Sequence, residues 1–169
     1  MSNDSPFRRG TRAPPTNPAG APPAKTGRQT WKGNAAGPNQ GGCTITAAPL
    51  IAKGKVIVGV TGGDSAHRGY LNAFDLKTGR HLWRFWTIPS AGEPGSETWV
   101  GKALEHGCGT TWLTGTYDPE TKLLYWPTGN PCPDYNGDER KGDNLYNPSV
   151  VELNPATGKL KGRYQFTPH

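Results

Sequence analysis

The chain has 169 residues, of which 33% are hydrophobic, and it contains 24 glycines and 17 prolines. Its formal net charge is +6. Its length permits a sizeable core, but the low hydrophobic content favours a loop-rich fold or an incomplete one. No stretch approaches the ~20 apolar residues of a membrane-spanning helix, and residues 1–20 lack the apolar core of a secretory signal, so we expect neither feature.

Basic residues concentrate in the N-terminal part of the chain. Residues 1–63 contain eight Lys or Arg and a single acidic residue, Asp4, whereas residues 64–169 contain eleven basic and twelve acidic residues. A basic segment can bind nucleic acid by counterion release, but this one lacks interleaved aromatic residues and any recognisable binding motif. We therefore expect no nucleic-acid partner. Residues 1–24 are rich in Pro, Arg and Ala without periodicity, which predicts a disordered tail.

The rest of the chain, 25–169, has the pattern of short strands. The stretch AAPLIAKGKVIVGVTGG (47–63) contains two apolar runs joined by a Lys-Gly turn, which predicts a hairpin. Further stretches rich in β-branched and aromatic residues follow, each bounded by Gly, Pro, Asn or Asp: YLNAFD, HLWRFW, TWLTGTY, KLLYW, SVVEL and KLKGRYQF. No window has a persuasive helical period, so the sequence predicts an all-β fold.

Three turn sequences repeat along this region and share Thr-Gly followed by a basic residue: AKTGRQTW (24–31), LKTGRHLW (76–83) and PATGKLKG (155–162). The first two carry a tryptophan four positions after the glycine, Trp31 and Trp83, whereas the third has Gly162 there. Four-stranded blades of ~40–50 residues with insertions are typical of β-propellers. We therefore expect a partial β-propeller of about three four-stranded blades, in which both tryptophans dock against a neighbouring blade. Three blades cannot close a ring.

The cysteines and acidic residues match no standard metal-binding pattern. Cys43, Cys108 and Cys132 form no CxxC pair, which makes a zinc site unfavourable, and the four histidines share no ligand spacing. A disulfide between Cys108 and Cys132 is possible in an oxidising compartment, but spacing alone leaves the bonded and unbonded alternatives open. Residues 134–145 resemble a calcium loop, yet Glu139 and Leu145 stand where an EF-hand needs Gly and Glu.

A long polar loop interrupts the strand pattern at YWPTGNPCPDYNGDERKGDN (125–144). Asn130 lies in it between Gly129 and Pro131, and both pairs are turn signals. A simple turn is one explanation of this motif. The other is a functional loop that directs the Asn130 amide into a site.

With the repeat and this loop, the chain resembles the PQQ-dependent (quinoprotein) alcohol and methanol dehydrogenases, eight-bladed β-propellers that use pyrroloquinoline quinone (PQQ) and a calcium or lanthanide ion. The resemblance runs from about Lys25 to His169. The stretches that carry it are TITAAPLIAKGKVIVGVTGGDSAHRGYLNAFDLKTGRHLWRF, PGSETW, TTWLTGTYDPETKLLYWPTGNP and GDNLYNPSVVELNPATGKLKGRYQFTPH. It implies that the chain is a partial piece of such a propeller.

The resemblance also implies a set of site residues. Trp112 matches the tryptophan that lies flat under the quinone, where a large rigid aromatic ring gains most from face-to-face contact. Asn130 and Asp64 match the metal ligands, because calcium and lanthanide ions prefer oxygen donors. Asp64 departs from the glutamate of many relatives and is shorter by one methylene. The remaining cofactor-binding positions implied by the match are Thr46, Thr61, Gly62, Gly63 and Thr110.

Alternatives to these roles stay open at this stage. Trp112 could be a buried strand tryptophan, and a salt bridge is at least as good a role for Arg68, which we leave out of the site. As a whole, the chain could be a non-catalytic β-propeller interaction module that has lost its cofactor, since Thr-Gly turns serve packing alone. Retention of Trp112, Asn130 and an acid at 64 argues against this alternative.

The activity implied is the oxidation of a primary alcohol, by hydride transfer to metal-polarised PQQ, with an electron acceptor such as a cytochrome c and a periplasmic location. In that family the catalytic aspartate follows the Thr-Pro-His stretch that here occupies 167–169. We therefore assign no catalytic residue and expect this fragment to be inactive alone.

Overall fold

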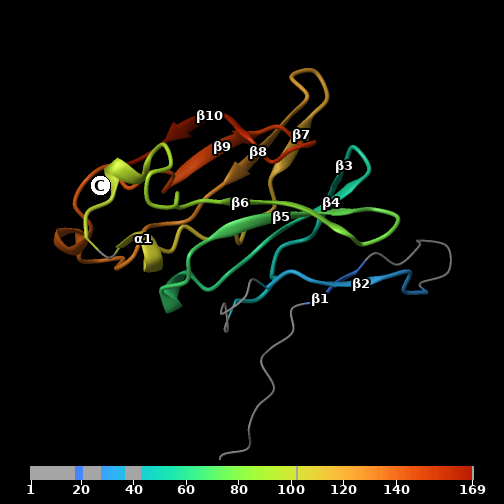
Figure 1. Cartoon of the computed structure of the whole chain (residues 1–169), viewed down its shortest axis with the longest axis horizontal. Coiled ribbons are helices and arrows are strands. Elements are labelled where there is room, and N and C mark those ends of the chain that lie inside the picture. The colour runs from blue at the N-terminus through green and yellow to red at the C-terminus, as the bar shows by residue number, and fades with distance from the viewer. Residues whose placement is uncertain (1–17, 21–27, 37–42, 102, 169) are drawn as a thin grey trace, which may run out of the picture.

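The computed structural model describes residues 18–20, 28–36, 43–101 and 103–168, which form an all-β structure with a few short helices (Figure 1). In these ranges the strands make two four-stranded antiparallel sheets and one two-stranded pair. The first sheet contains, in spatial and chain order, β3 (Leu50–Ala52), β4 (Lys55–Gly59), β5 (Tyr70–Asp75) and β6 (His81–Trp86). The second contains β7 (Thr116–Asp118), β8 (Leu123–Pro127), β9 (Ser149–Leu153) and β10 (Leu160–Gln165). The pair is β1 (Pro18–Gly20) with β2 (Lys32–Asn34).

The helical elements are short and lie in the connections between strands. They are η1 (Gly63–Ser65), η2 (Ser96–Thr98), α1 (Ala103–His106) and η3 (Gly137–Arg140). In the ranges that the structure describes, no helix has the length and apolar character needed to cross a membrane.

The first sheet lies between the N-terminal segment and the second sheet (Figure 1). Strand β4 shows why its sequence, KVIVG, is a continuous apolar run. Ile57 points into the core shared with the second sheet, whereas Val56 and Val58 pack against Ala35 of the N-terminal segment. A sheet covered on both faces needs apolar residues on both sides of the strand. The shared core contains Ile57, Leu71, Ala73 and Trp83 from the first sheet and Leu124, Trp126, Val151 and Leu153 from the second.

The repeated turns dock the tryptophans as the sequence predicts. The Trp83 indole donates a hydrogen bond to the Pro155 carbonyl at 3.1 Å, and a Cβ on Gly158 would lie only 2.6 Å from the Trp83 ring. Trp31 repeats this arrangement one unit earlier, because its indole donates to the Leu76 carbonyl at 2.9 Å and its ring covers Gly79. Each tryptophan ring thus packs on the glycine of the Thr-Gly turn in the following unit. A Cβ at that glycine would clash with the ring.

Most predicted strands are confirmed, including the Lys53–Gly54 turn between β3 and β4. The stretch TWLTGTY is an exception, because only its end belongs to a strand, β7. Its first residues form an irregular segment instead. The Thr111 hydroxyl in this segment hydrogen-bonds the Val60 amide and the Tyr70 carbonyl at the edge of the first sheet. A Cβ on Gly115 would lie 2.5 Å from the Trp126 ring, so this position packs closely against the core.

The expected fold class, a piece of an all-β structure built from four-stranded antiparallel units, is confirmed. Of the three units expected, two are complete four-stranded sheets in the described ranges, and β1 with β2 stands in the place of the third. Residues 1–17 and 21–24 of the predicted tail lie outside the described residues. Pro18–Gly20, within the predicted tail, forms strand β1.

Candidate functional site

Eight residues from four separate segments line one cavity of about 380 Å³. They are Thr46, Thr61, Gly62, Gly63, Asp64, Thr110, Trp112 and Asn130. These are the eight positions that the family resemblance marks as cofactor-binding or metal-binding. The structure therefore brings the whole predicted set together, although the residues are spread over 85 positions of the chain, from 46 to 130.

The segment that carries Thr110 and Trp112 lies directly against the end of the first sheet. The Thr111 amide donates to the Val60 carbonyl at 2.9 Å, and the Gly69 amide donates to the Cys108 carbonyl at 2.6 Å. Glycines permit this approach, since a Cβ on Gly59 would lie 2.0 Å from the Thr111 carbonyl oxygen and one on Gly69 2.2 Å from that of Gly109. Any side chain at either glycine would push the cavity wall away from the sheet.

A second wall of the cavity comes from the residues before β3. The Thr61 amide donates to the Thr44 carbonyl at 2.9 Å, and the two threonine hydroxyls are 2.6 Å apart. Cys43 is buried beside this contact, and burial raises the pKa of its thiol. Thr46 is held at the cavity by this pairing and by its own hydroxyl, which donates to the Trp112 carbonyl at 3.4 Å.

The Asn130 loop is tied to the Trp112 segment by a short antiparallel ladder. The Gly129 amide donates to the Thr110 carbonyl at 2.8 Å, and the Gly109 amide donates to the Asn130 carbonyl at 2.9 Å. The Cys132 amide continues the ladder with a 3.1 Å bond to the Gly107 carbonyl. Asn130 is therefore placed beside Thr110 by backbone bonds on both sides of it.

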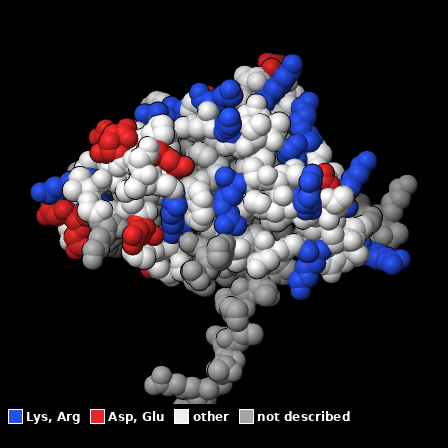
Figure 2. Space-filling model, viewed as in Figure 1, with Lys and Arg blue, Asp and Glu red and all other residues white. Residues whose placement is uncertain are grey.

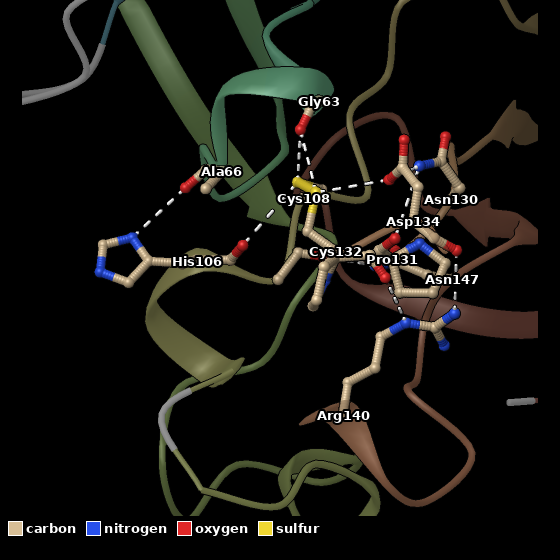
Figure 3. Close-up of a disulfide and its surroundings, with 12 residues drawn as sticks. Gly63, Ala66, His106, Cys108, Asn130, Pro131, Cys132, Asp134, Arg140 and Asn147 are labelled. Atoms are coloured by element: carbon tan, nitrogen blue, oxygen red, sulfur yellow. Dashed lines mark hydrogen bonds between the residues drawn. A yellow bond between two sulfur atoms is a disulfide. The ribbon is translucent and has the colours of Figure 1, made fainter. Parts of the chain in front are cut away.

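A disulfide between Cys108 and Cys132 closes the same two segments, with their Cα atoms 5.3 Å apart (Figure 3). The structure thus decides the alternative that spacing left open. The Gly63 carbonyl oxygen lies 2.5 Å from Cys108 Sγ and 3.0 Å from Cys132 Sγ, so the bridge also contacts the turn that precedes Asp64. Three cavity segments meet at this one covalent link.

The three side chains with the most specific expected roles are all accessible from the cavity. Trp112 is 49% exposed, which excludes the alternative of a buried strand tryptophan. Asp64 lies on η1 after Gly62, whose φ of 106° is in the left-handed region, and its carboxylate makes no hydrogen bond or ion pair with another described residue. Asn130 is exposed and donates from Nδ2 to Asp134, so its Oδ1 remains available.

Arg68 does not line the 380 Å³ cavity, and it makes no salt bridge with another described residue. Its guanidinium donates to the Ile88 carbonyl and the Ser90 hydroxyl and lies 4.3 Å from the centre of the Trp86 ring. Burial lowers the pKa of Arg68, an effect that Glu93 opposes by its charge. The described residues contain no carboxylate within ion-pair distance of it.

A larger cavity of about 530 Å³ adjoins the first one and shares Asp64 with it. Its lining includes His106, Asp134 and Glu139. Figure 2 shows that acidic side chains gather at the end of the molecule that carries α1 and η3, whereas Lys and Arg spread over the sheets. An acidic surface of this kind favours the approach of cations.

Sequence reasoning missed several residues that build the site. Gly59, Gly69 and Thr111 set the approach of the Trp112 segment, and Asp134 holds the Asn130 amide. Turn-like glycines and a loop aspartate are common in sequences, so nothing in the one-dimensional pattern distinguished these four.

Stacked four-stranded antiparallel sheets, joined by docked tryptophans and bearing a loop-lined cavity, define a piece of a β-propeller. A family model described as "PQQ: Glucose/ethanol/alcohol dehydrogenase, beta-propeller domain" matches residues 21–169, and the chain belongs to this family.

Each of the following similar proteins is longer than this chain. Quinohemoprotein alcohol dehydrogenase ADH-IIG of Pseudomonas putida is 38% identical over 161 residues, which are 86% of this chain and 22% of that protein. The lanthanide-dependent methanol dehydrogenase of Methylacidiphilum fumariolicum is 38% identical over 164 residues, which are 86% of this chain and 26% of that protein. The crystal structure of quinohemoprotein alcohol dehydrogenase from Comamonas testosteroni superposes with a TM-score of 0.79 at 39% identity, covering 84% of this chain and 23% of that one. A europium-containing methanol dehydrogenase superposes with a TM-score of 0.78 at 37% identity, covering 86% and 28%.

The chain thus spans about a quarter of the length of the relatives it matches. It is a partial piece of a quinoprotein dehydrogenase propeller.

Proposed function

We propose that the chain supplies the cofactor and metal floor of a PQQ-dependent dehydrogenase that oxidises primary alcohols. The observation that carries this proposal is the single cavity lined by all eight residues that the family resemblance marks. The alternative of a non-catalytic interaction module does not explain why an exposed indole and two oxygen-bearing side chains line the same cavity.

The residues present fit both groups. Trp112 offers a half-exposed aromatic face to a planar ring system, and the small residues Gly62 and Gly63 let the backbone approach an anionic ligand. Asp64 and Asn130 offer one carboxylate and one neutral amide oxygen. A calcium ion takes six to eight oxygen ligands, so these two supply part of a shell that the cofactor, water or other chain segments complete.

When bound, PQQ would supply a hydride acceptor for alcohol oxidation, and the ion would supply Lewis acidity. The chain's own contribution is to hold and orient. Trp112 would lie against the face of the ring system, and the hydroxyls of Thr46, Thr61 and Thr110 at the cavity wall would hydrogen-bond the cofactor. Asp64 and Asn130 would hold the ion. We assign no catalytic residue to this cavity, because its lining contains no Asp, Glu or His besides the proposed metal ligand Asp64.

The electron acceptor and the location belong to the same proposal. One relative, from Methylorubrum extorquens, is named methanol dehydrogenase [cytochrome c] subunit 1. A cytochrome c acceptor and a periplasmic location are therefore the ones we propose here, with calcium or a lanthanide as the ion. The name of the lanthanide-dependent methanol dehydrogenase supports a lanthanide as the ion.

The test is binding of PQQ in the presence of calcium or a lanthanide, followed by quenching of tryptophan fluorescence. We expect saturable quenching in the parent protein, much weaker quenching in Trp112→Phe and loss of the metal dependence in Asn130→Ala. Trp31→Phe is the matched control, because Trp31 packs on Gly79 away from the cavity. Absence of quenching in the parent with either metal would favour the interaction-module alternative instead.

A further inference from the structure

The Asn130 amide is held in one direction by its neighbours in the same loop (Figure 3). Its Nδ2 donates to a carboxylate oxygen of Asp134 and, at 3.4 Å, to the Pro131 carbonyl. An ionised carboxylate and a carbonyl accept hydrogen bonds but cannot donate them, so both require the nitrogen end of the amide. The Oδ1 atom is consequently turned away from Asp134 and is left without a hydrogen bond to any described residue.

This direction matters for any cation that Asn130 binds. A primary amide can present either end after a rotation of its terminal torsion, and only the oxygen end attracts a positive ion. By accepting a hydrogen bond from Nδ2, Asp134 disfavours the rotamer in which the nitrogen end of the Asn130 amide would face the ion. Groups that orient a ligand in this way from the second layer of a metal site typically contribute 10- to 100-fold to metal affinity.

Asp134 is itself held firmly enough to play this part. Arg140 is buried and donates from Nε to the Pro133 carbonyl at 3.0 Å and from Nη2 to the Asp134 carbonyl at 3.5 Å. On the other side, Cys132 is fixed by its disulfide to Cys108. The segment 132–134 is thus anchored at both ends, by the disulfide at Cys132 and by the buried Arg140 guanidinium at Asp134.

Asp134 is placed differently from the two proposed ligands. Asp64 and Asn130 both line the 380 Å³ cavity, whereas Asp134 lines only the adjoining 530 Å³ cavity. Its carboxylate reaches the first cavity through the Asn130 amide.

We propose that Asp134 is a positioning residue that directs the Asn130 oxygen toward the metal ion and does not itself bind the ion. This inference rests on the proposed function, because it takes Asn130 to be a ligand. It assigns to the loop after Asn130 a role that reaches beyond turn formation. The acceptor oxygen of Asp134 is the feature that matters, and its charge is secondary.

The test uses terbium(III) alone as the probe, with its luminescence sensitised by the indole of Trp112 on the cavity wall. Asp134→Leu removes the acceptor at similar volume, and we expect it to raise the terbium Kd about 10-fold or more. Asp134→Asn keeps an acceptor oxygen without the charge, and we expect a Kd within about threefold of the parent, because the second amide can turn its oxygen to Asn130 Nδ2. Glu139→Gln is the matched control, since it removes a charge from the lining of the same larger cavity.

The outcomes separate the alternatives. A Kd raised equally in Asp134→Asn and Asp134→Leu would show that the carboxylate charge binds the ion directly, and an unchanged Kd in Asp134→Leu would show that it has no role; either result overturns the proposal. Unfolding of the metal-free variants, followed in parallel, shows whether the loop is intact. Failure of the proposed function looks different. The parent would then not bind terbium at the cavity, or Asn130→Ala would bind it as tightly as the parent.

Discussion

Thr111 connects the ends of two strands to the wall of the cavity. Its Oγ1 accepts a hydrogen bond from the Val60 amide at 2.9 Å and donates one to the Tyr70 carbonyl at 2.6 Å, and the residue is only 1% exposed. The next residue, Trp112, is 49% exposed. One residue therefore fixes the backbone against the first sheet while its neighbour presents a side chain to the cavity.

We expect Thr111→Val to destabilise the protein by about 1–3 kcal/mol, because it removes the hydroxyl that bonds the Val60 amide and the Tyr70 carbonyl while keeping the volume. Urea unfolding measures the change. Thr111→Ser, which retains the hydroxyl, should recover most of it. Thr114→Val, at an exposed hydroxyl that donates to the Ala48 carbonyl, should stay within about 0.5 kcal/mol of the parent. Equal losses at 111 and 114 would contradict this account of Thr111.

Single residues of the site differ in how far the sequence could predict them. Trp112 and Trp126 both stand in short aromatic stretches, yet one is half-exposed at the cavity and the other is 0% exposed in the core. Nothing local distinguishes them, because their burial is decided by which segment packs on the first sheet. Asp64 and Asn130 were found through family resemblance, whereas Asp134 was missed because its role depends on a contact with an amide four residues earlier.

At the scale of elements, the Thr-Gly turns and the disulfide do different work. The turns join successive units through tryptophan docking, at Gly79 under Trp31 and at Gly158 under Trp83. The disulfide joins two loops at the cavity, across 24 residues of chain. The turns were predictable because the motif repeats in the sequence. The disulfide was not, since a separation of 24 residues is compatible with many Cα distances and only the fold brings the two cysteines to 5.3 Å.

Gly158→Ala should destabilise the protein more than Gly54→Ala. The two glycines have nearly equal φ angles, 70° and 69°, so an alanine suffers the same backbone strain of about 1–2 kcal/mol at either position. At Gly54 an added Cβ meets nothing within 4 Å, whereas at Gly158 it would lie 2.6 Å from the Trp83 ring. Displacement of the Trp83 ring adds about 1–3 kcal/mol to the loss of stability at Gly158. Urea unfolding measures this contribution as the difference in unfolding free energy between the two variants. Equal effects would mean that Trp83 does not depend on a close turn.

Removing the disulfide by the double change Cys108→Ala and Cys132→Ala should lower the free energy of unfolding by about 3 kcal/mol under oxidising conditions. The reason is that the unfolded chain regains the freedom of a loop of 24 residues. Guanidinium unfolding with and without a thiol reductant measures the change. The reductant should bring the parent down to the level of the double variant and leave the variant itself unchanged. A parent insensitive to full reduction would show that the link contributes no stability.

At the scale of the whole molecule, a core shared by the two sheets positions the loops that line the proposed cofactor site. Two sheets share a core in which residues from β4, β5 and β6 meet residues from β8 and β9. The loops that leave this core converge on one cavity with an aromatic face and two oxygen donors. The chain spans about a quarter of the length of its relatives. Stacking of units was predictable from the repeat. The convergence of the loops was predictable only through the family resemblance, because it depends on close contacts at Gly59 and Gly69 that no local pattern shows.

The 169-residue chain supplied with PQQ and calcium should not oxidise primary alcohols in a dye-linked assay. Apart from the proposed metal ligand Asp64, no Asp, Glu or His lines the 380 Å³ cavity, so no residue described there can take the hydroxyl proton of the substrate as hydride leaves its carbon. Binding and turnover should therefore separate: fluorescence quenching by PQQ would appear without dye reduction. A complete quinoprotein alcohol dehydrogenase, assayed in parallel, controls for the dye and the cofactor. Measurable turnover by the chain alone would mean that Asp64 acts as the base, and would require a different set of metal ligands.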